Sequence, residues 1–383
     1  MRNVGFLRPC RISPVGQHLN DCAIICQILF SLKGMSMYNP LKERHSVMKK
    51  PTLVDVGKES GVSAITVSRA LRDPDRVSIA LRERVFAAIE KLGYVPDAAA
   101  ATLASNRSSV IAVLVPSFSN YVFSDVLAGA SNVIEGTKYS VQIGNTGYSA
   151  LTEEAMIPKF LTLKPAGIII AGVDQTEKSR KMLAAADCPV VQIMDTSDDP
   201  IDVIVGFSNF LASAEAVAHM IEQGFRRIAF VGTRMDPRTQ QRLAGYRSIM
   251  EAHGLFDEAL LVTTPQKSSV EIGRHLLGSL LEKVPGCDGV FCNNDDVAVG
   301  VALECHRRNI RIPQDMGICG FNDLGTTSQM QPAITSVNTP RAEIGARAAQ
   351  YILDRNAGLP QPENRNINLG FALKVRASTQ RKT

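Results

Sequence analysis

The chain has 383 residues, of which 45% are hydrophobic, and a formal net charge of +5. This length predicts two or three domains, and the composition excludes a fibrous or disordered chain. A membrane protein is also excluded, because the longest apolar stretch, Ala23 to Leu32, has about half of the roughly 20 residues that a bilayer span requires.

The positive charge is concentrated near the amino terminus. Lys and Arg outnumber Asp and Glu by six to two over residues 1–48 and by ten to seven over residues 49–108, whereas the remainder is slightly acidic. A basic amino-terminal part is typical of phosphate binding, although many solvated helical domains reach the same excess.

Residues 51–85 have the pattern of two short helices joined by a glycine turn. Thr52 is a good N-cap for the first helix, Gly61 relieves the turn, and Ser63 is a good N-cap for the second helix. The apolar residues expected to pack between the two helices are Leu53, Val54, Val56, Val67 and Leu71. The pattern predicts a helix-turn-helix.

The other residues of the second helix are candidates for touching DNA, namely Ala64, Ile65, Thr66, Ser68 and Arg69. A third helix follows, with Ser78 as its N-cap. Its inner stripe comprises Leu81, Val85, Ile89 and Leu92. An αα-hairpin that binds no DNA has the same local pattern, so the rest of the chain is needed to distinguish it from a DNA-binding helix-turn-helix.

From Ser109 onward, short apolar runs alternate with amphipathic helical stretches. The runs are VIAVLVP, SVQIGN, AGIIIAG, VVQIMD, RIAFVG, GVFCNN and MGICGF. Runs of this length that are rich in Val and Ile predict buried parallel strands in successive βαβ units. We therefore expect two Rossmann-like halves.

Polar and aromatic residues that follow these runs are candidates for ligand binding, because open parallel sheets bind ligands beyond the carboxyl ends of their strands. They are Phe123, Asp195, Arg238, Arg242, Asn294 and Asp295. Asp and Asn at such positions also cap helices, which is an equally good interpretation of Asn294. Arg238 and Arg242 are four residues apart and can present both guanidinium groups to a carboxylate or phosphate, which favours an anionic ligand.

Five of the eight cysteines lie in or beside apolar runs, where reduced core residues are expected, and this indicates a cytoplasmic protein. Cys22 and Cys26 with His18 match no common zinc-site spacing. Neither a metal nor a cofactor is expected.

Four segments occur in an order that resembles the LacI/GalR family of bacterial repressors over nearly all of residues 49–380. These are GVSAITVSRAL, VSIALRERV, LGYVPDAAAATLAS and NDDVAVG. The segments RDPDRVSIALR, VGFSNF, RTQQRLAGY and FCNNDDVAVG are most similar to the gluconate-utilisation repressor branch.

The resemblance implies a multidomain chain. It consists of an all-α helix-turn-helix domain (48–96), a hinge helix and linker (97–108), and an α/β type I periplasmic-binding-protein-like core (109–383). The first subdomain of that core is expected at 109–206 and 320–360, and the second at 207–319 and 361–383. Residues 1–47 are expected to be a disordered extension or an over-called start, with a signal peptide as the alternative.

The resemblance also implies roles for individual residues. Arg242 in RLAG and Asp295 in NDD fall where relatives hold a sugar hydroxyl or an anionic group, and Asp195 and Phe123 occupy wall positions of the same site. Leu103 matches the leucine that relatives wedge between central bases, but Ala101 stands where many members have Arg.

Ala64 and Ile65 match the family's variable base-reading positions, and their side chains cannot donate hydrogen bonds. Arg69 is therefore the strongest candidate for reading guanine. Ser63, Thr66, Ser68 and Ser78 have hydroxyl groups suited to phosphates. Thr52 is a further DNA-binding candidate.

Together these features predict a repressor of carbohydrate catabolism genes. The resemblance implies a homodimer or tetramer that binds a palindromic double-stranded operator and responds to a sugar acid such as gluconate. A sugar phosphate and a neutral sugar are alternative effectors, and either release or recruitment of DNA is compatible with the family.

Two other classes are disfavoured. An enzyme is not expected, because no glycine-rich nucleotide fingerprint follows a strand, and the nucleophile-elbow lookalike at 206–210 lacks its second glycine. A sugar-binding transport protein shares the core fold, but is expected to carry a secretory signal and no helix-turn-helix.

Overall fold

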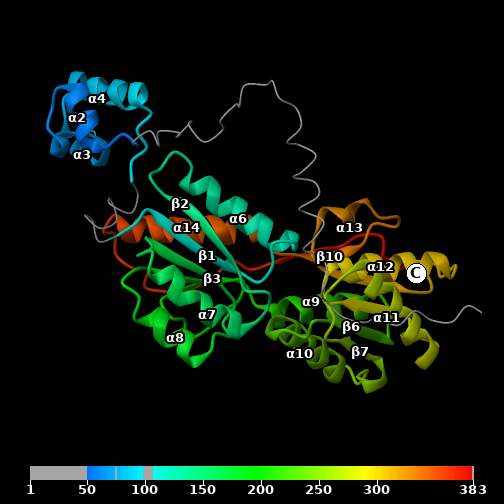
Figure 1. Cartoon of the computed structure of the whole chain (residues 1–383). Coiled ribbons are helices and arrows are strands. Elements are labelled where there is room, and N and C mark those ends of the chain that lie inside the picture. Colours follow the sequence, from blue (N-terminus) through cyan, green and yellow to red (C-terminus); the bar gives the residue numbers. More distant parts are fainter. Residues whose placement is uncertain (1–49, 74–75, 98–106, 382–383) are drawn as a thin grey trace, which may run out of the picture. The chain divides into compact units, whose positions relative to one another are not determined.

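The computed structural model describes residues 50–73, 76–97 and 107–381, and the chain forms two compact units that divide after Pro96 (Figure 1). The expectations for residues 1–47, for the hinge helix and for Leu103 lie outside the described residues. None of the helices that the structure describes combines the length and apolarity needed to cross a bilayer.

The amino-terminal unit consists of three helices, α2 (Leu53–Ser60), α3 (Ala64–Arg72) and α4 (Ile79–Leu92). Helix α2 begins with a capping box, in which Thr52 and Asp55 each accept a hydrogen bond from the other's backbone N–H. It ends at Gly61, whose φ of 69° is left-handed and favours glycine. The predicted order of caps and turn is therefore confirmed.

A small apolar core joins these three helices. Val56, Val67 and Val85 are fully buried, and Leu53, Leu71 and the predicted stripe of α4 pack around them. The prediction was wrong for Val54, which is 53% exposed. Leu53 and Val56 are three residues apart and share the inner face, so the helical period turns Val54 outward.

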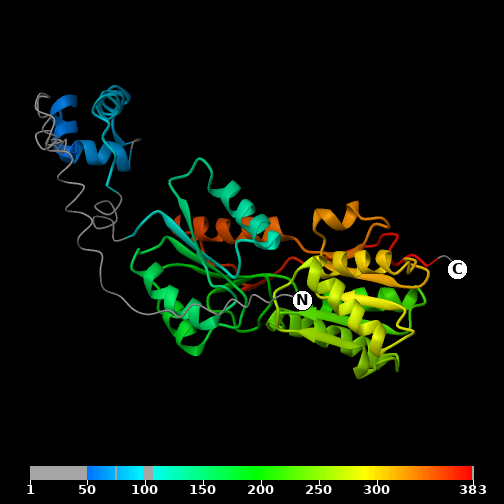
Figure 2. The same cartoon turned by 45° about the vertical axis from the view of Figure 1, so that its right-hand side comes forward.

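The second unit contains two six-stranded sheets, each forming one lobe with its helices (Figures 1 and 2). The first lobe has the strand order β11-β5-β4-β3-β1-β2, and the second has β12-β10-β9-β8-β6-β7. All pairs are parallel except β10 with β12. The prediction of two Rossmann-like halves is confirmed.

The strands of the first sheet are β1 (Val110–Val115), β2 (Ser140–Asn145), β3 (Gly167–Ala171), β4 (Val190–Ile193), β5 (Val203–Gly206) and β11 (Asn366–Asn368). Its helices are α6 (Tyr121–Ile134), α7 (Ala150–Leu161), α8 (Glu177–Ala184) and α14 (Arg341–Asn356). The strands of the second sheet are β6 (Ile228–Thr233), β7 (Leu261–Thr264), β8 (Gly289–Cys292), β9 (Gly317–Asn322), β10 (Thr335–Asn338) and β12 (Ala372–Lys374). Its helices are α9 (Asn209–Glu222), α10 (Pro237–Ala252), η2 (Glu258–Leu260), α11 (Val270–Lys283), α12 (Asp295–Arg307) and α13 (Gly325–Gln329).

Alternation along β1 shows how both faces of the first sheet are covered. Ile111, Val113 and Val115 pack toward α6 and α14, whereas Ala112 and Leu114 pack with residues of α7 and α8. Successive strand residues point to opposite faces, so a continuous apolar run is required where helices cover both. Strand β2 departs from this expectation: it is an edge strand with largely exposed side chains.

Three chain segments cross between the lobes, and their positions correct the expected subdomain boundaries. Strands β9 and β10 pair within the second sheet, so the chain returns to the first lobe only after Asn338, not near residue 320. Strand β11 then pairs with β5 in the first sheet, although residues 361–383 were expected in the second subdomain. The pairing partner of a short apolar strand is set by tertiary packing, which the local sequence does not encode.

The described cysteines are free, and four of the five are buried: Cys287, Cys292, Cys305 and Cys319. Burial raises the pKa of the Cys287 thiol to about 11. The predicted core position is therefore confirmed for these four cysteines, whereas Cys188 is only partly buried.

Candidate functional site

Helix α3 presents an exposed surface on the side away from its core. Ile65 is 74% exposed, and Arg69 is also exposed. Among the described residues, the Arg69 side chain has no hydrogen-bond or ion-pair partner, so its donors are free for an outside acceptor. Ala64, Thr66 and Ser68 are half-buried at the edges of this surface.

The hydroxyl residues expected to hold phosphates differ in how they are engaged. Thr52 and Ser63 accept hydrogen bonds from backbone N–H groups at the starts of α2 and α3, and the Ser63 and Thr66 hydroxyls lie 2.9 Å apart. Ser78 is exposed at the start of α4 and makes no such capping bond. Contact of these residues with DNA stays a prediction.

A cleft opens in the second unit at the carboxyl ends of the strands, and both lobes line it. The lining residues are Asn120, Val122, Phe123, Tyr148, Met194, Arg234, Asp236, Arg238, Thr239, Arg242, Ser268, Asn293, Asn294 and Asn322. Four of the six predicted ligand residues belong to this set, as the strand-end rule leads one to expect.

Arg238 has the most unusual environment of these residues. Its Nη2 lies 3.8 Å from Asp236 Oδ2, and its guanidinium lies 5.8 Å from the centre of the Phe123 ring in the other lobe. Its Nη1 is buried and has no hydrogen-bond partner among the described residues. A buried charged donor without an acceptor costs about 1–3 kcal/mol or more, so this nitrogen is suited to a ligand oxygen.

Arg242 lies beside Arg238 but uses its donors within the protein. Its Nε donates to Asn209 Oδ1 at 2.9 Å, its Nη1 donates to the Asn293 carbonyl oxygen at 2.6 Å, and its guanidinium lies 3.7 Å from the Phe321 ring centre. Burial lowers its pKa to about 10, so the group stays protonated at neutral pH. The two arginines therefore do not present both guanidinium groups to one ligand, as their spacing suggested.

Two predicted acidic residues lie outside the cleft lining. Asp195 is buried, and its carboxylate accepts from Thr196 N–H and from Gln241 Nε2. Asp295 is fully buried and accepts from Leu324 N–H at 2.7 Å and from Ser336 Oγ at 2.6 Å. Because both Asp295 oxygens are occupied by protein donors, the structure gives this residue a role in fixing the turn after β9.

Asn294 lines the cleft and also caps a helix. Its Oδ1 accepts from Val297 N–H at the start of α12, and its Nδ2 donates to Ser268 Oγ at 2.8 Å. The helix-cap interpretation is therefore confirmed, and contact of Asn294 with a ligand stays a prediction.

Several lining residues were missed by sequence reasoning. Tyr148 and Arg234 meet across the two lobes, with the guanidinium 4.0 Å from the ring centre, and both have positive φ. Asn293 and Asn322 also face the cleft. Their signal was weak, because Asn at a strand end is more often a helix cap.

Glu153 of α7 is a buried acid near this site. Its pKa is raised to about 7, mainly by burial and also by the charge of Asp174, while the charge of Arg238 acts in the opposite direction.

A second hollow lies at the amino ends of β4 and β5. Its arginines already bond protein acceptors: Arg107 bonds Asp187, Arg355 bonds the Leu359 carbonyl, and Arg365 bonds the Pro200 carbonyl. The cleft, with its unpartnered donor, is the better candidate for ligand binding.

Comparisons with known proteins agree with this architecture. Residues 52–97 match the model of bacterial regulatory proteins of the lacI family, and residues 217–379 match a periplasmic binding protein-like domain. The HTH-type transcriptional regulator GntR of Pseudomonas aeruginosa is 39% identical over 330 residues, which cover 86% of this chain and 96% of that protein. Its namesake in Escherichia coli is 38% identical over 325 residues, covering 85% and 97%.

Among solved structures, a LacI-family transcriptional regulator from Silicibacter pomeroyi is similar with a TM-score of 0.79 and 37% identity. The match covers 86% of this chain and all of that one. The chain belongs to the lacI family of bacterial regulatory proteins and is a DNA-binding transcriptional regulator.

Proposed function

We propose that the protein is a repressor of genes for sugar-acid catabolism, and that a gluconate-type acid in the cleft controls its operator binding. It acts in the cytoplasm as a homodimer, with one α3 helix in each half of a palindromic operator.

The single observation that supports an anionic effector is the environment of Arg238. Its Nη1 is buried and has no acceptor among the described residues, and its ion pair with Asp236 spans 3.8 Å. A ligand carboxylate supplies the missing acceptor and a charge-assisted hydrogen bond, which is about twice as strong as a neutral one.

The rest of the cleft suits a polyhydroxylated chain. The amide of Asn322 has both donors and an acceptor, as sugar hydroxyls require. Asn120 and Ser268 also line the cleft, but their polar groups already form hydrogen bonds within the protein. Phe123 and Met194 offer apolar surface for the C–H faces of the same ligand.

Isothermal titration calorimetry of the full-length protein tests this proposal. Gluconate is expected to bind and glucose is not, because glucose lacks the carboxylate. Glucose 6-phosphate, which has a phosphate and no carboxylate, distinguishes a sugar acid from a sugar phosphate. Equal binding of glucose and gluconate, or binding of glucose 6-phosphate alone, contradicts the proposal.

Arg238→Lys provides the matched variant. It retains the charge but loses the planar array of donors, so gluconate affinity is expected to fall at least about tenfold. Operator affinity without ligand is expected to stay the same, because Arg238 lies in the core unit. A variant that binds gluconate as tightly as the wild type contradicts the role assigned to Arg238.

A further inference from the structure

Tyr148 and Arg234 form a contact between the two lobes at the cleft. Tyr148 lies in the loop between β2 and α7 of the first lobe, and Arg234 lies in the loop between β6 and α10 of the second. The Arg234 guanidinium lies 4.0 Å from the centre of the Tyr148 ring, and both half-buried residues line the cleft. A cation at this distance from an aromatic face is attracted to it, and partial burial strengthens the attraction.

The backbone on each side holds these two side chains in place separately. Tyr148 has a φ of 61°, and Arg234 and Met235 have φ values of 63° and 52°. Such a conformation persists at a non-glycine residue only where its surroundings enforce it. The Arg234 N–H donates to the Gln266 carbonyl oxygen at 3.0 Å, and the Tyr148 hydroxyl accepts from Asn120 Nδ2 at 3.1 Å. Each lobe therefore presents its own half of the contact.

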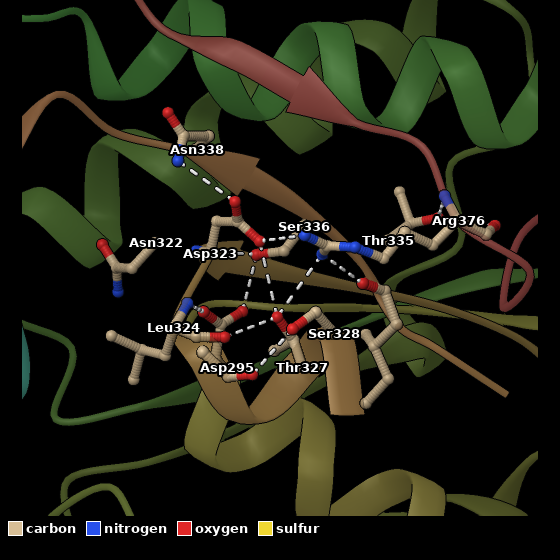
Figure 3. Close-up of polar contacts among 12 residues, drawn as sticks. Asp295, Asn322, Asp323, Leu324, Thr327, Ser328, Thr335, Ser336, Asn338 and Arg376 are labelled. Atoms are coloured by element: carbon tan, nitrogen blue, oxygen red, sulfur yellow. Dashed lines mark hydrogen bonds and ion pairs between the residues drawn. The ribbon is translucent and has the colours of Figure 1, made fainter. Parts of the chain in front are cut away.

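The contact differs from a bond between the lobes that lies where the chain crosses. Arg341 follows the crossing after β10 and donates to the Asn322 carbonyl oxygen of the second lobe. The turn that contains Asn322 is held by the ion pair and hydrogen bonds of Asp323 (Figure 3). In a hinge motion the crossing segments absorb the change in backbone angles, so bonds beside them move least. Tyr148 and Arg234 belong to no crossing segment, so separation of the lobes breaks their contact.

The cleft is too small for a sugar acid while this contact is made. It encloses about 50 Å³, whereas small-molecule sites in proteins have roughly 300–1,000 Å³. The Tyr148 ring centre also lies 5.9 Å from the guanidinium of Arg238, the group assigned to the ligand carboxylate. Entry of a ligand therefore requires Tyr148 and Arg234 to separate.

We infer that the contact between Tyr148 and Arg234 is an autoinhibitory latch, which holds the lobes in an arrangement that excludes the ligand. The apparent affinity of a ligand is reduced to the extent that the binding-competent arrangement is depopulated. Loss of the latch therefore strengthens ligand binding, whereas loss of a residue that contacts the ligand weakens it. The effect on affinity rests on the proposed function, because it requires a sugar acid in the cleft.

Arg234→Gln tests the latch, because it removes the cation and retains a polar side chain at the same backbone position. It is expected to bind gluconate about threefold to tenfold more tightly than wild type by calorimetry, as a partly buried cation–π contact allows. Tyr148→Leu is expected to give the same gain, and the double variant no more than either single variant.

Arg234→Lys is the matched control, since it keeps a cation and is expected to bind gluconate as wild type does. Gluconate binding by Arg234→Gln that is unchanged or weaker than that of wild type overturns the latch.

A measurement without ligand tests the latch separately from the proposed function. The chain has no Trp, so Tyr148→Trp places a single indole at the contact, and indole attracts cations better than phenol does. Adding Arg234→Gln is expected to raise the acrylamide quenching constant of this indole about twofold, because the lobes separate more often. Adding Arg234→Lys is expected to leave it unchanged.

Equal quenching with and without Arg234→Gln overturns the inference alone. If quenching changes as expected but neither wild type nor any variant binds gluconate, the proposed function fails while the latch is supported.

Discussion

Arg69 and Arg238 both have unpartnered guanidinium nitrogens, but their surroundings give these nitrogens different consequences. Arg69 is exposed on α3, where water satisfies its donors at little cost. The Nη1 of Arg238 is buried, so this nitrogen carries an energetic penalty until an acceptor arrives. The first is suited to reading DNA transiently, and the second to retaining a small anion.

Arg69→Ala is expected to weaken operator binding by about 1–3 kcal/mol and to relax preference at one base pair in each half-site. The reason is the loss of a bidentate contact to guanine. Fluorescence anisotropy with operator and random duplexes measures both effects. Arg72→Ala is the control, since Arg72 pairs with Asp73 at 3.2 Å. Equal losses on operator and random DNA for Arg69→Ala contradict base reading.

Glu153 makes stability depend on pH. Its pKa is raised to about 7, mainly by burial, so the folded state keeps a proton that the unfolded state loses near pH 4.5. The contribution of Glu153 to the free energy of unfolding is therefore fully retained below about pH 4.5. As pH rises toward 7, the free energy of unfolding falls by up to about 3 kcal/mol.

Glu153→Gln is expected to remove this loss, so that the variant exceeds wild type in melting temperature at pH 8 but not at pH 5. Glu154→Gln is the control, because hydrogen bonds from Thr176 and Lys178 lower the pKa of Glu154 instead. Parallel melting curves for wild type and Glu153→Gln across this range show that Glu153 does not titrate as described.

At the residue scale, the sequence predicted cleft residues whose chemistry is evident from type and spacing. Arg238 and Phe123 are examples, since both follow apolar runs that became strands. Asp295 has an equally suggestive position, but its carboxylate is used by Leu324 and Ser336, which are distant in sequence. Asn322 was not predictable, because its orientation depends on a turn that is held by residues of β10, α12 and α14 and by Arg376.

Among the elements, the seven apolar runs all became strands, and the strands without such a run were missed. Strand β7 is only partly buried, and β11 and β12 have three residues each, so none of these three carries a strong periodic signal. Strand β5 is a buried apolar run as long as β4 and was overlooked. Polar Thr335 and Ser336 are fully buried in β10, where hydrogen bonds to Ser378, Arg376 and Asp295 replace apolar packing.

Helices α6 and α14 lie side by side over the first sheet, and glycine allows their close approach (Figures 1 and 2). A Cβ added at Gly345 would lie 1.9 Å from the Val126 carbonyl oxygen, and one at Gly129 would lie 1.9 Å from the Ala342 carbonyl oxygen. Both contacts are with backbone, which cannot yield without moving a helix.

Gly345→Ala is accordingly expected to lower the free energy of unfolding by about 1–3 kcal/mol, the usual cost of overpacking. Chemical denaturation followed by circular dichroism measures the change. Gly325→Ala in α13 is the control, since an added Cβ there meets nothing within 4 Å. Equal stabilities for the two variants contradict the close helix contact.

On the scale of the whole molecule, the cleft residues come from two lobes that are joined by three crossing segments. Arg238 belongs to the second lobe and lies near Phe123 and Tyr148 of the first. A ligand that bonds both lobes stabilises one arrangement of them over others, and only such a difference in affinity shifts a conformational equilibrium. In the proposed function, this shift is what the operator-binding unit responds to.

The most direct test of this account is the anisotropy of a labelled palindromic operator titrated with the full-length protein, with and without gluconate at saturating concentration. The account predicts that gluconate changes the operator dissociation constant at least about tenfold for wild type, whereas glucose leaves it unchanged. It also predicts that at a gluconate concentration that half-saturates the wild type, the operator response of Arg238→Lys is largely lost. An operator dissociation constant that is the same with and without gluconate contradicts it.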